Sequence, residues 1–510
     1  MIPVIDIFAG PGGLGEGFSS LKDRTGRSAF KIRLSLEKEE HAHRTLQLRA
    51  FFRQFDLGRV PEDYYRALRG ELAIDDLYQN HPEKAEAARG EAVCLTLGEK
   101  TWKQTESLIR QALRGQDRWV LIGGPPCQAY SLAGRARNKG IEGYDPAGDH
   151  RHFLYREYLK ILGTFHPSVF VMENVKGLLS SRPEGSLIFD QIQRDLADPA
   201  EALGNRHSNN GSRRYMYRLF SLSAENIRGP QRFVLRSELY GVPQSRHRVI
   251  IIGVRDDITG LAPAQLHPVP PVSVKKVIGD LPPLRSGLSR SEDTPQAWLG
   301  VVQDSQHQSW FRSTLKKETE IGDALRSALS ALRKPRKDRG GEFIPWDIDI
   351  EEKREWFFDR RLKGVCNHTA RGHIEQDLYR YFFAACFAEA QGISPTLRDF
   401  PVQLLPDHEN VSKSVEEGSL FQDRFRVQVA GRPATTITSH ISKDGHYYIH
   451  YDPTQCRSLT VREAARLQTF PDNYFFTGPR TAQYQQVGNA VPPLMASQIA
   501  ASVLELLERR

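Results

Sequence analysis

Short apolar runs alternate with longer amphipathic stretches over the first half of the chain. Apolar side chains recur at helical spacing in one such stretch, which Asp149 can cap and which ends before His166-Pro167; they are Leu154, Tyr155, Tyr158, Leu159 and Leu162. Five runs have the length and the β-branched or aromatic content of buried strands. They cover residues 3–8, 31–36, 119–122, 168–172 and 249–254. Strands that alternate with helices predict an α/β fold built on a mostly parallel sheet.

This alternation weakens after residue 255, where clustered prolines mark a linker (Pro270-Pro271 and Pro282-Pro283). Helical periodicity returns in the last part of the chain, over residues 461–468 and 494–507. The pattern therefore divides the chain into three stretches: residues 1–255, 256–456 and 457–510.

Composition excludes several classes of protein. The chain has 510 residues, of which 39% are hydrophobic and 26% are charged, as in an ordinary globular protein of several domains. No apolar run approaches the roughly 18 residues of a membrane span, and the N-terminus lacks the basic region of a signal peptide. The five cysteines form no C-x-x-C pair. We therefore expect neither disulfides nor a metal site, and a location in the reducing cytoplasm.

The net charge of +8 permits a nucleic-acid partner without requiring one. The densest basic segment is residues 333–339, with five positive charges against one negative, and aromatic residues follow it. Two interpretations of this segment remain open: a solvated loop, or a surface that contacts phosphate.

A glycine-rich turn follows the first predicted strand. Gly10, Gly12 and Gly13 allow the backbone to approach a ligand closely before a helix begins. The second strand ends at Glu37, where a carboxylate can bind the hydroxyls of a ribose. The glycines are closer together than in the G-x-G-x-x-G pattern of dinucleotide sites. A nucleoside cofactor without a pyrophosphate is therefore favoured over NAD.

Three further strand ends carry polar chemistry. Cys127 follows Gly-Gly-Pro-Pro after the third strand, and this stiff backbone favours a presented nucleophile over a buried cysteine. Glu173 follows the fourth strand, where a helix N-cap is the alternative role. Before the last strand, Gln244, Arg246 and Arg248 alternate and are predicted to share a side. The two guanidiniums suit a phosphate or a base carbonyl, and a solvated basic edge is the alternative.

Together these motifs resemble the DNA cytosine-5 methyltransferase family, and they occur in that family's order. They read Asp-x-Phe-Ala-Gly-x-Gly-Gly from residue 6, Pro-Pro-Cys-Gln from 125, Glu-Asn-Val from 173 and Gln-x-Arg-x-Arg from 244. Two more matches are Arg-Ser-Leu-Thr-Val-Arg-Glu from 457 and Gln-Val-Gly-Asn-Ala-Val-Pro-Pro from 486. The resemblance implies a Rossmann-like, S-adenosylmethionine-dependent catalytic domain from residues 1–255 and 457–510. A smaller target-recognition domain then spans residues 256–456.

The resemblance also implies a role for each matching residue. Cys127 is the nucleophile that adds to C6 of a flipped cytosine, and Glu173 engages N3 and N4 of that base. Arg248 reaches the O2 edge, and Arg246 supports it. Residues 134–140 are similar to a loop that closes over DNA. The residues that match S-adenosylmethionine-contacting positions are Phe8, Gly10, Gly12, Gly13, Glu37, Pro126, Leu154 and Asn489.

The expected reaction is methylation of C5 in a specific sequence of double-stranded DNA, by an enzyme that acts as a monomer in the cytoplasm, at the nucleoid. A restriction or phage-defence system is the expected setting, with its cognate proteins as possible partners. Two alternatives remain: a tRNA cytosine-5 methyltransferase, and a non-catalytic DNA-binding regulatory subunit. The length of residues 256–456 speaks against the first, and the intact Cys127, Glu173 and Arg248 speak against the second.

Overall fold

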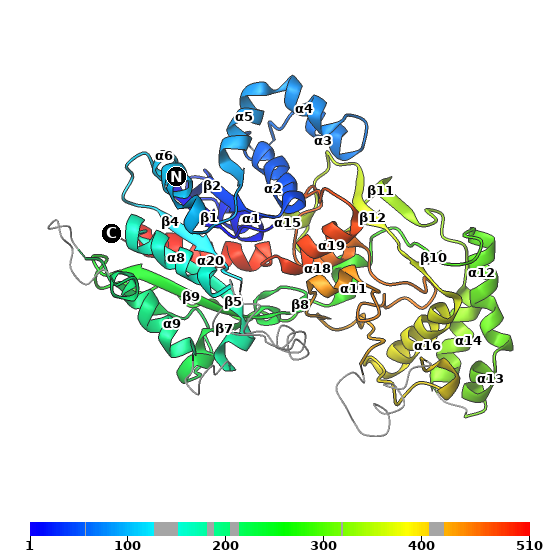
Figure 1. Ribbon diagram of the computed structural model, residues 1–510. Coiled ribbons are helices and arrows are strands. Elements are labelled where there is room, and N and C mark those ends of the chain that lie inside the picture. Colours follow the sequence, from blue (N-terminus) through cyan, green and yellow to red (C-terminus); the bar gives the residue numbers. More distant parts are fainter. Residues whose placement is uncertain are drawn as a thin grey trace.

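The computed structural model describes residues 1–56, 58–126, 151–180, 188–204, 214–317, 320–406 and 423–509 (Figure 1). Cys127 and residues 134–140 lie outside the described residues, so the roles expected for them stay predictions.

An eight-stranded sheet forms the larger part of the molecule. Its order is β3-β2-β1-β4-β5-β9-β6, and β7 also pairs with β9. The first five of these strands run parallel, and β9 is antiparallel to β5, β6 and β7. The bounds are β1 Ile2–Ile7, β2 Phe30–Glu37, β3 Ala92–Cys94, β4 Val120–Gly123, β5 Val169–Val175, β6 Tyr217–Phe220, β7 Val234–Arg236 and β9 His247–Arg255. The prediction of an α/β fold with a mostly parallel sheet is confirmed.

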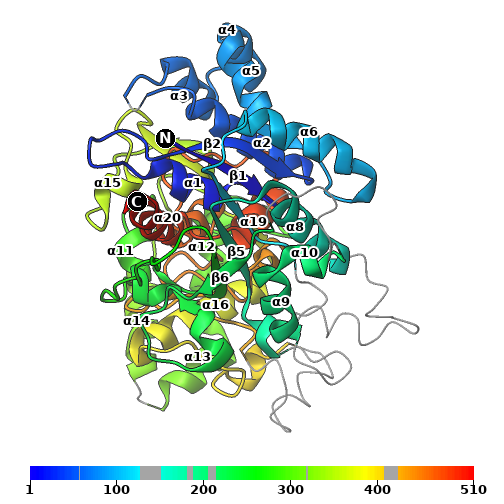
Figure 2. The same ribbon diagram turned by 90° about the vertical axis from the view of Figure 1, so that its left-hand side faces the viewer.

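Helices cover both faces of this sheet (Figure 2). On one face α1 (Gly13–Ser20) and α20 (Pro493–Glu508) bury Phe18 and Ile499 against the strands. On the other face α6 (Trp102–Leu113), α8 (Arg151–Phe165) and α9 (Ile188–Ala197) share a second apolar core. Beyond β2, four helices form a separate cluster: α2 Glu40–Phe52, α3 Glu62–Leu68, α4 Ile74–Asn80 and α5 Pro82–Glu91. The short α10 is Pro199–Ala202.

The C-terminal stretch Arg480–Glu508 is long and apolar enough to pass as a membrane span, which the pattern of apolar runs did not suggest. However, 67% of its most apolar window is buried inside the protein. It consists of α19 (Arg480–Asn489) and α20, and α20 packs so closely on α1 that a Cβ on Gly17 would lie 2.5 Å from the Pro493 carbonyl. Its apolar side chains therefore belong to the core beside the sheet.

A second, mainly helical part follows the sheet. One apolar core joins the four largest helices that the structure describes in this part. They are α12 Pro295–Asp304, α13 Ser309–Leu315, α14 Glu320–Ala331 and α16 Glu375–Gln391. Two-stranded ladders lie beside them: β10 Gly287–Leu288 with β13 Gly372–His373, and β11 Gly340–Pro345 with β12 Gly364–Thr369. Between the two parts lie α11 Val274–Ile278, α15 Arg354–Phe357 and α18 Val461–Leu467, and β14 Ala434–Thr435 pairs with β8 Gln244–Ser245.

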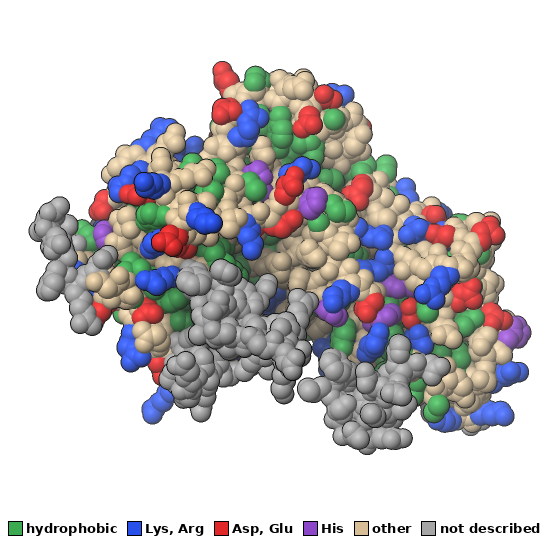
Figure 3. Space-filling model, viewed as in Figure 1, with side chains coloured by type: hydrophobic (Ala, Val, Ile, Leu, Met, Phe, Trp, Pro, Cys, Tyr) green, Lys and Arg blue, Asp and Glu red, His purple; other side chains and the backbone are tan. Residues whose placement is uncertain are grey.

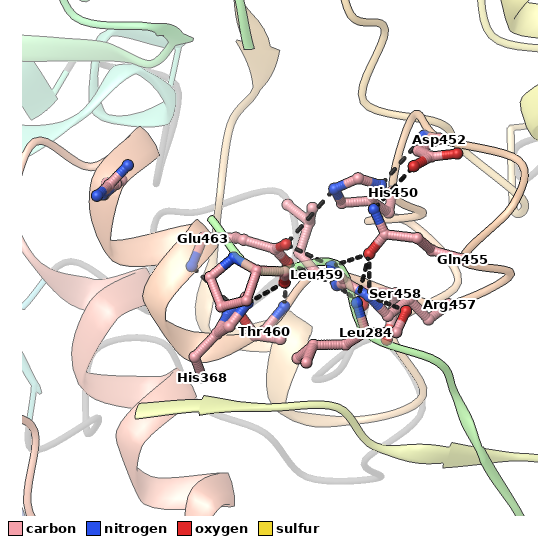
Figure 4. Close-up of polar contacts among 12 residues, drawn as sticks. Leu284, His368, His450, Asp452, Gln455, Arg457, Ser458, Leu459, Thr460 and Glu463 are labelled. Atoms are coloured by element: carbon pink, nitrogen blue, oxygen red, sulfur yellow. Dashed lines mark hydrogen bonds and ion pairs between the residues drawn. The ribbon is translucent and has the colours of Figure 1, made fainter. Parts of the chain in front are cut away.

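A buried polar network joins the last stretch of the chain to the helical part (Figure 4). Thr460 and Glu463 form a capping box at the start of α18, and Arg457 donates two hydrogen bonds of 2.7 and 2.6 Å to the Glu463 carboxylate. His368 contacts the Thr460 hydroxyl at 2.8 Å and the Pro282 carbonyl at 2.9 Å. Burial lowers the pKa of His368 to about 4, so the ring is neutral at physiological pH. The network fixes α18 against the strand β12.

Candidate active site

The chemistry-bearing motifs meet at one edge of the sheet. Because β1, β2, β4 and β5 are parallel, their carboxyl ends share this edge. The glycine turn follows β1, Glu37 ends β2, Gly124 follows β4, and Glu173 lies near the end of β5. The antiparallel β9 begins at the same edge, where Arg248 pairs with Val175. Glu173 is therefore a strand residue and not a helix N-cap.

Glu173 and Arg248 form an ion pair at this edge. Arg248 Nε lies 2.9 Å from Glu173 Oε1, and the side chains are 12% and 14% exposed for the arginine and the glutamate. Burial lowers the pKa of Arg248, and the neighbouring Glu173 carboxylate opposes this shift. The second carboxylate oxygen of Glu173 points toward the loop after β4. The pair presents a carboxyl group and a guanidinium side by side, which suits the polar edge of a heterocyclic base.

Two residues to which the sequence analysis assigned no role hold this loop against β5. A Cβ on Gly124 would lie 2.8 Å from Glu173 Oε2, so only a glycine leaves room for the carboxylate. Asn174 Nδ2 donates a 3.1 Å hydrogen bond to the Pro125 carbonyl. Pro125 is two residues before Cys127, so Asn174 restrains the backbone that leads to the cysteine. The Glu-Asn-Val motif could have indicated a role for Asn174, since this residue directly follows Glu173 in the motif.

We expect Gly124→Ala to lower kcat by roughly 10- to 100-fold, because the new methyl group displaces the Glu173 carboxylate from its position. The displaced atom is the end of a flexible side chain, so the melting temperature should change little. Steady-state kinetics and a thermal melt check the two expectations. The matched control is Gly90→Ala in α5, where a Cβ meets no described atom within 4 Å. Equal kcat values for Gly124→Ala and the wild type would contradict the placement of Glu173.

Arg246 does not share the position of Arg248. It is 2% exposed, and its Nη1 donates to the carbonyls of Ile437 at 2.7 Å and Gly488 at 3.2 Å. Gln244 is also buried, and its side chain accepts a hydrogen bond from the Ile437 amide. The expectation that these alternate residues offer two guanidiniums to a ligand is therefore corrected. Arg248 lies at the sheet edge, whereas Arg246 ties β8 and β9 to two distant segments of the chain.

The glycine turn and Glu37 form a cradle of fixed shape. Gly10 donates its amide to Glu37 Oε2 at 2.8 Å, and Gly12 is the N-cap of α1, with a φ of 98°. A Cβ on Gly13 would lie 2.2 Å from the Val491 carbonyl, so the turn sits directly against the start of α20. A Cβ on Gly10, in contrast, would meet no described atom within 4 Å. The described residues therefore leave space beside Gly10, and this space suits the ribose of a nucleoside.

The remaining residues predicted to contact the cofactor lie on other elements. Phe8 follows β1 with a φ of 56° and is half-buried. Pro126 follows β4, and Leu154 lies in the first turns of α8; both are half-buried. Asn489 is the last residue of α19 and is exposed, two residues before the Val491 carbonyl that touches Gly13. The residues predicted to contact the cofactor thus come from both ends of the chain, and their contact with it stays a prediction.

Asp6 lies directly beneath the cradle and is fully buried. Among the described residues no side chain donates a hydrogen bond to its carboxylate oxygens, and only the nearby Gly15 amide opposes the effect of burial from the backbone. Burial raises the pKa of Asp6 to about 8, with Arg53 opposing the shift and Glu37 adding to it. The carboxyl group is therefore protonated at neutral pH, and it places a neutral polar group under the open space.

The raised pKa of Asp6 predicts a pH-dependent effect of Asp6→Asn on stability. Below about pH 4 the carboxyl is neutral in the folded and unfolded chains, so its ionisation costs nothing. Between about pH 4 and pH 8 it ionises only in the unfolded chain, which destabilises the wild type progressively. We expect the melting temperature of the variant, relative to that of the wild type, to be higher at pH 8 than at pH 5. A difference that is the same at both pH values would contradict a neutral Asp6.

Comparison with known proteins identifies the family. The model of the C-5 cytosine-specific DNA methylase family matches residues 100–199 and 230–505, which is more than half of the chain. The chain belongs to this family. It is a DNA (cytosine-5-)-methyltransferase, and its cofactor is S-adenosylmethionine.

Individual relatives cover nearly the whole chain. The type II methyltransferase M.Bpa9945I of Bacillus paralicheniformis is 32% identical, over 99% of each chain. The type II methyltransferase M.AgeI of Thalassovita gelatinovora is 27% identical, over 98% of each chain. Among solved structures, a DNA modification methyltransferase encoded within a prophage of E. coli aligns with a TM-score of 0.51 at 18% identity, over 100% of each chain. This structural likeness supports the fold.

Proposed function

We propose that the sheet edge described above methylates C5 of a cytosine that has been flipped out of a specific duplex DNA sequence. The observation that carries this proposal is the Glu173–Arg248 pair beside the loop that leads to Cys127. It lies at the same edge as the glycine cradle. A base inside a duplex is out of reach of these side chains, so it must leave the stack to be modified.

In the proposed reaction, the Cys127 thiolate adds to C6 of the cytosine, and a C6–S bond forms. Glu173 holds a proton at N3 while electron density develops there, and Arg248 binds O2. S-adenosylmethionine supplies the methyl group that C5 takes up. Loss of the C5 proton to a base then breaks the C6–S bond, which returns the thiolate and releases 5-methylcytosine.

The other site residues position these groups. We assign Phe8, Gly10, Gly12, Gly13, Glu37, Pro126, Leu154 and Asn489 to the cofactor, with Glu37 at the ribose hydroxyls. Arg246 supports Arg248 from the buried side of β8 and β9, through the carbonyls of Ile437 and Gly488. The open space beside Gly10 supports a nucleoside at this position. Its amide bond to Glu37 keeps the carboxylate at the rim of that space.

The domain division and the biological setting belong to the same proposal. Residues 1–255 and 457–510 form the catalytic domain, and residues 256–456 form the target-recognition domain, which reads the duplex. The relatives are named as type II methyltransferases, which supports a protective role in a restriction-modification or phage-defence system. We propose that the enzyme works as a monomer on DNA in the cytoplasm, at the nucleoid.

Methyl transfer from labelled S-adenosylmethionine to duplex DNA, compared with transfer to tRNA, tests the proposed substrate. We expect label in DNA that contains the recognised sequence and none in tRNA. Label in tRNA alone would contradict the proposal and support the tRNA methyltransferase alternative. Binding of DNA without any transfer would support the non-catalytic alternative.

A further inference from the structure

The basic segment of residues 333–339 is a folded turn of defined shape between α14 and β11. Within it, the Asp338 amide donates to the Pro335 carbonyl at 3.1 Å, and the Gly340 amide donates to the Lys337 carbonyl at 2.8 Å. The Arg285 amide donates to the Asp338 carbonyl at 2.9 Å, which fixes the turn to the chain beneath it. The cations of this segment are therefore carried on a backbone of constrained shape, and not on a loose loop.

The single acid of the segment does not neutralise its cations. Asp338 forms an ion pair with Arg285, which is 1% exposed and also binds Asp293 at 2.5 Å. The exposed side chains of Lys334 and Arg336, and that of Lys337, form no ion pair with any described residue. Positive charge thus remains uncompensated on the surface of the turn.

A cavity of about 350 Å³ opens beside this turn. Four of its lining residues are cations of the segment (Arg333, Lys334, Arg336 and Lys337), and none of the lining residues is an acid. By comparison, acidic and basic side chains are interspersed over the described part of the face shown in Figure 3. Trp346 forms part of the wall, and its Nε1 donates to the Asp280 carbonyl at 2.8 Å, which fixes the ring. The cavity therefore combines a rigid wall with a concentration of positive charge.

We propose that this cavity binds a phosphate of the DNA backbone, outside the site that receives the flipped cytosine. Lysine and arginine side chains neutralise backbone phosphates, and such contacts position a protein on the duplex without reading its sequence. The inference goes beyond the catalytic chemistry proposed above. It rests on the proposed function, in which duplex DNA is the substrate. The positive charge of the cavity suits a phosphate, and duplex DNA presents backbone phosphates on both sides of the target cytosine.

A pair of charge-removing variants tests this contact. Lys334→Gln/Arg336→Gln removes two cations from the cavity. Lys316→Gln/Lys317→Gln removes two exposed lysines at the end of α13, which do not line it, and changes the net charge equally. The affinity for a duplex of about 30 base pairs that contains the recognised sequence is measured against salt concentration. Because the cavity is proposed to hold one phosphate, we expect the magnitude of the slope of log K against log salt to fall by about 0.9 for the cavity pair, and to stay unchanged for the control pair.

Equal changes in slope for the two pairs would overturn the proposal, because net charge alone would explain them. An unchanged slope for the cavity pair would also overturn it. If wild type but not the cavity pair then bound inorganic tripolyphosphate in calorimetry, the cavity would hold a free anion and not DNA. Methyl transfer by the wild-type enzyme separates this inference from the proposed function: transfer with an unchanged slope refutes the phosphate contact alone.

Discussion

Cys127→Ala is expected to abolish methyl transfer, with a loss on the order of 10⁴-fold or more, because the proposed covalent step depends on the thiolate of this residue. The variant should still bind S-adenosylmethionine, since the glycine cradle and Glu37 are untouched. Duplex DNA with 5-fluorocytosine at the target gives a second readout. The wild-type enzyme should form a complex with this DNA that survives denaturation, because C5 then carries no proton to lose, and the variant should not.

Cys366→Ala is the matched control for this experiment. Cys366 is buried, and burial raises the pKa of its thiol to about 12, so it supplies almost no thiolate near neutral pH. The control should keep its activity and form the stable complex. Methyl transfer by Cys127→Ala at the wild-type rate would contradict the covalent mechanism.

Glu173→Gln is expected to lower kcat by about 10²- to 10⁴-fold, the usual contribution of a general acid. The amide keeps the size of the side chain but cannot hold the proton at N3 or pair as an anion with Arg248. The affinity for S-adenosylmethionine should not change, because Glu173 lies on β5 and the cradle lies after β1. Single-turnover kinetics and cofactor titration measure the two quantities separately.

The control for Glu173 is Glu106→Gln, which breaks an exposed ion pair with Arg110 on α6. Such surface pairs contribute little to stability, so this variant should match the wild type in rate and in melting temperature. If Glu173→Gln lost cofactor affinity and kept kcat, the carboxylate would act at the cofactor and not at the base. That outcome would contradict its assigned role.

The central sheet could be predicted from the sequence because its strands are buried on both faces and appear as continuous apolar runs. All five predicted strands are present, with ends shifted by up to three residues. The short or partly polar strands gave no such signal: β3 has three residues, and β6 includes Arg218. The antiparallel course of β9 was also not predicted, because it depends on the connections between strands and not on the composition of the strand.

The site could be predicted where a motif ends a strand, since topology then brings the residues to one edge. The sequence could not predict contacts between residues that are far apart in the chain. Arg246 binds carbonyls 191 and 242 residues away, so its burial could not be inferred from its neighbours. Likewise, the need for glycine at position 124 arises from the Glu173 carboxylate on the adjacent strand. For residues 333–339, the sequence left open whether the cations are solvated or bind phosphate, and the turn and its cavity now favour phosphate.

The most direct test of the central claim is the chemical identity of the methylated base in DNA from cells that express this chain. DNA is hydrolysed to nucleosides, and bisulfite sequencing of the same sample locates the modified positions. The account predicts 5-methylcytosine within one recurring sequence for the wild type, and none for Cys127→Ala. Methylation at N4 of cytosine or at adenine, or 5-methylcytosine that persists in Cys127→Ala, would contradict it.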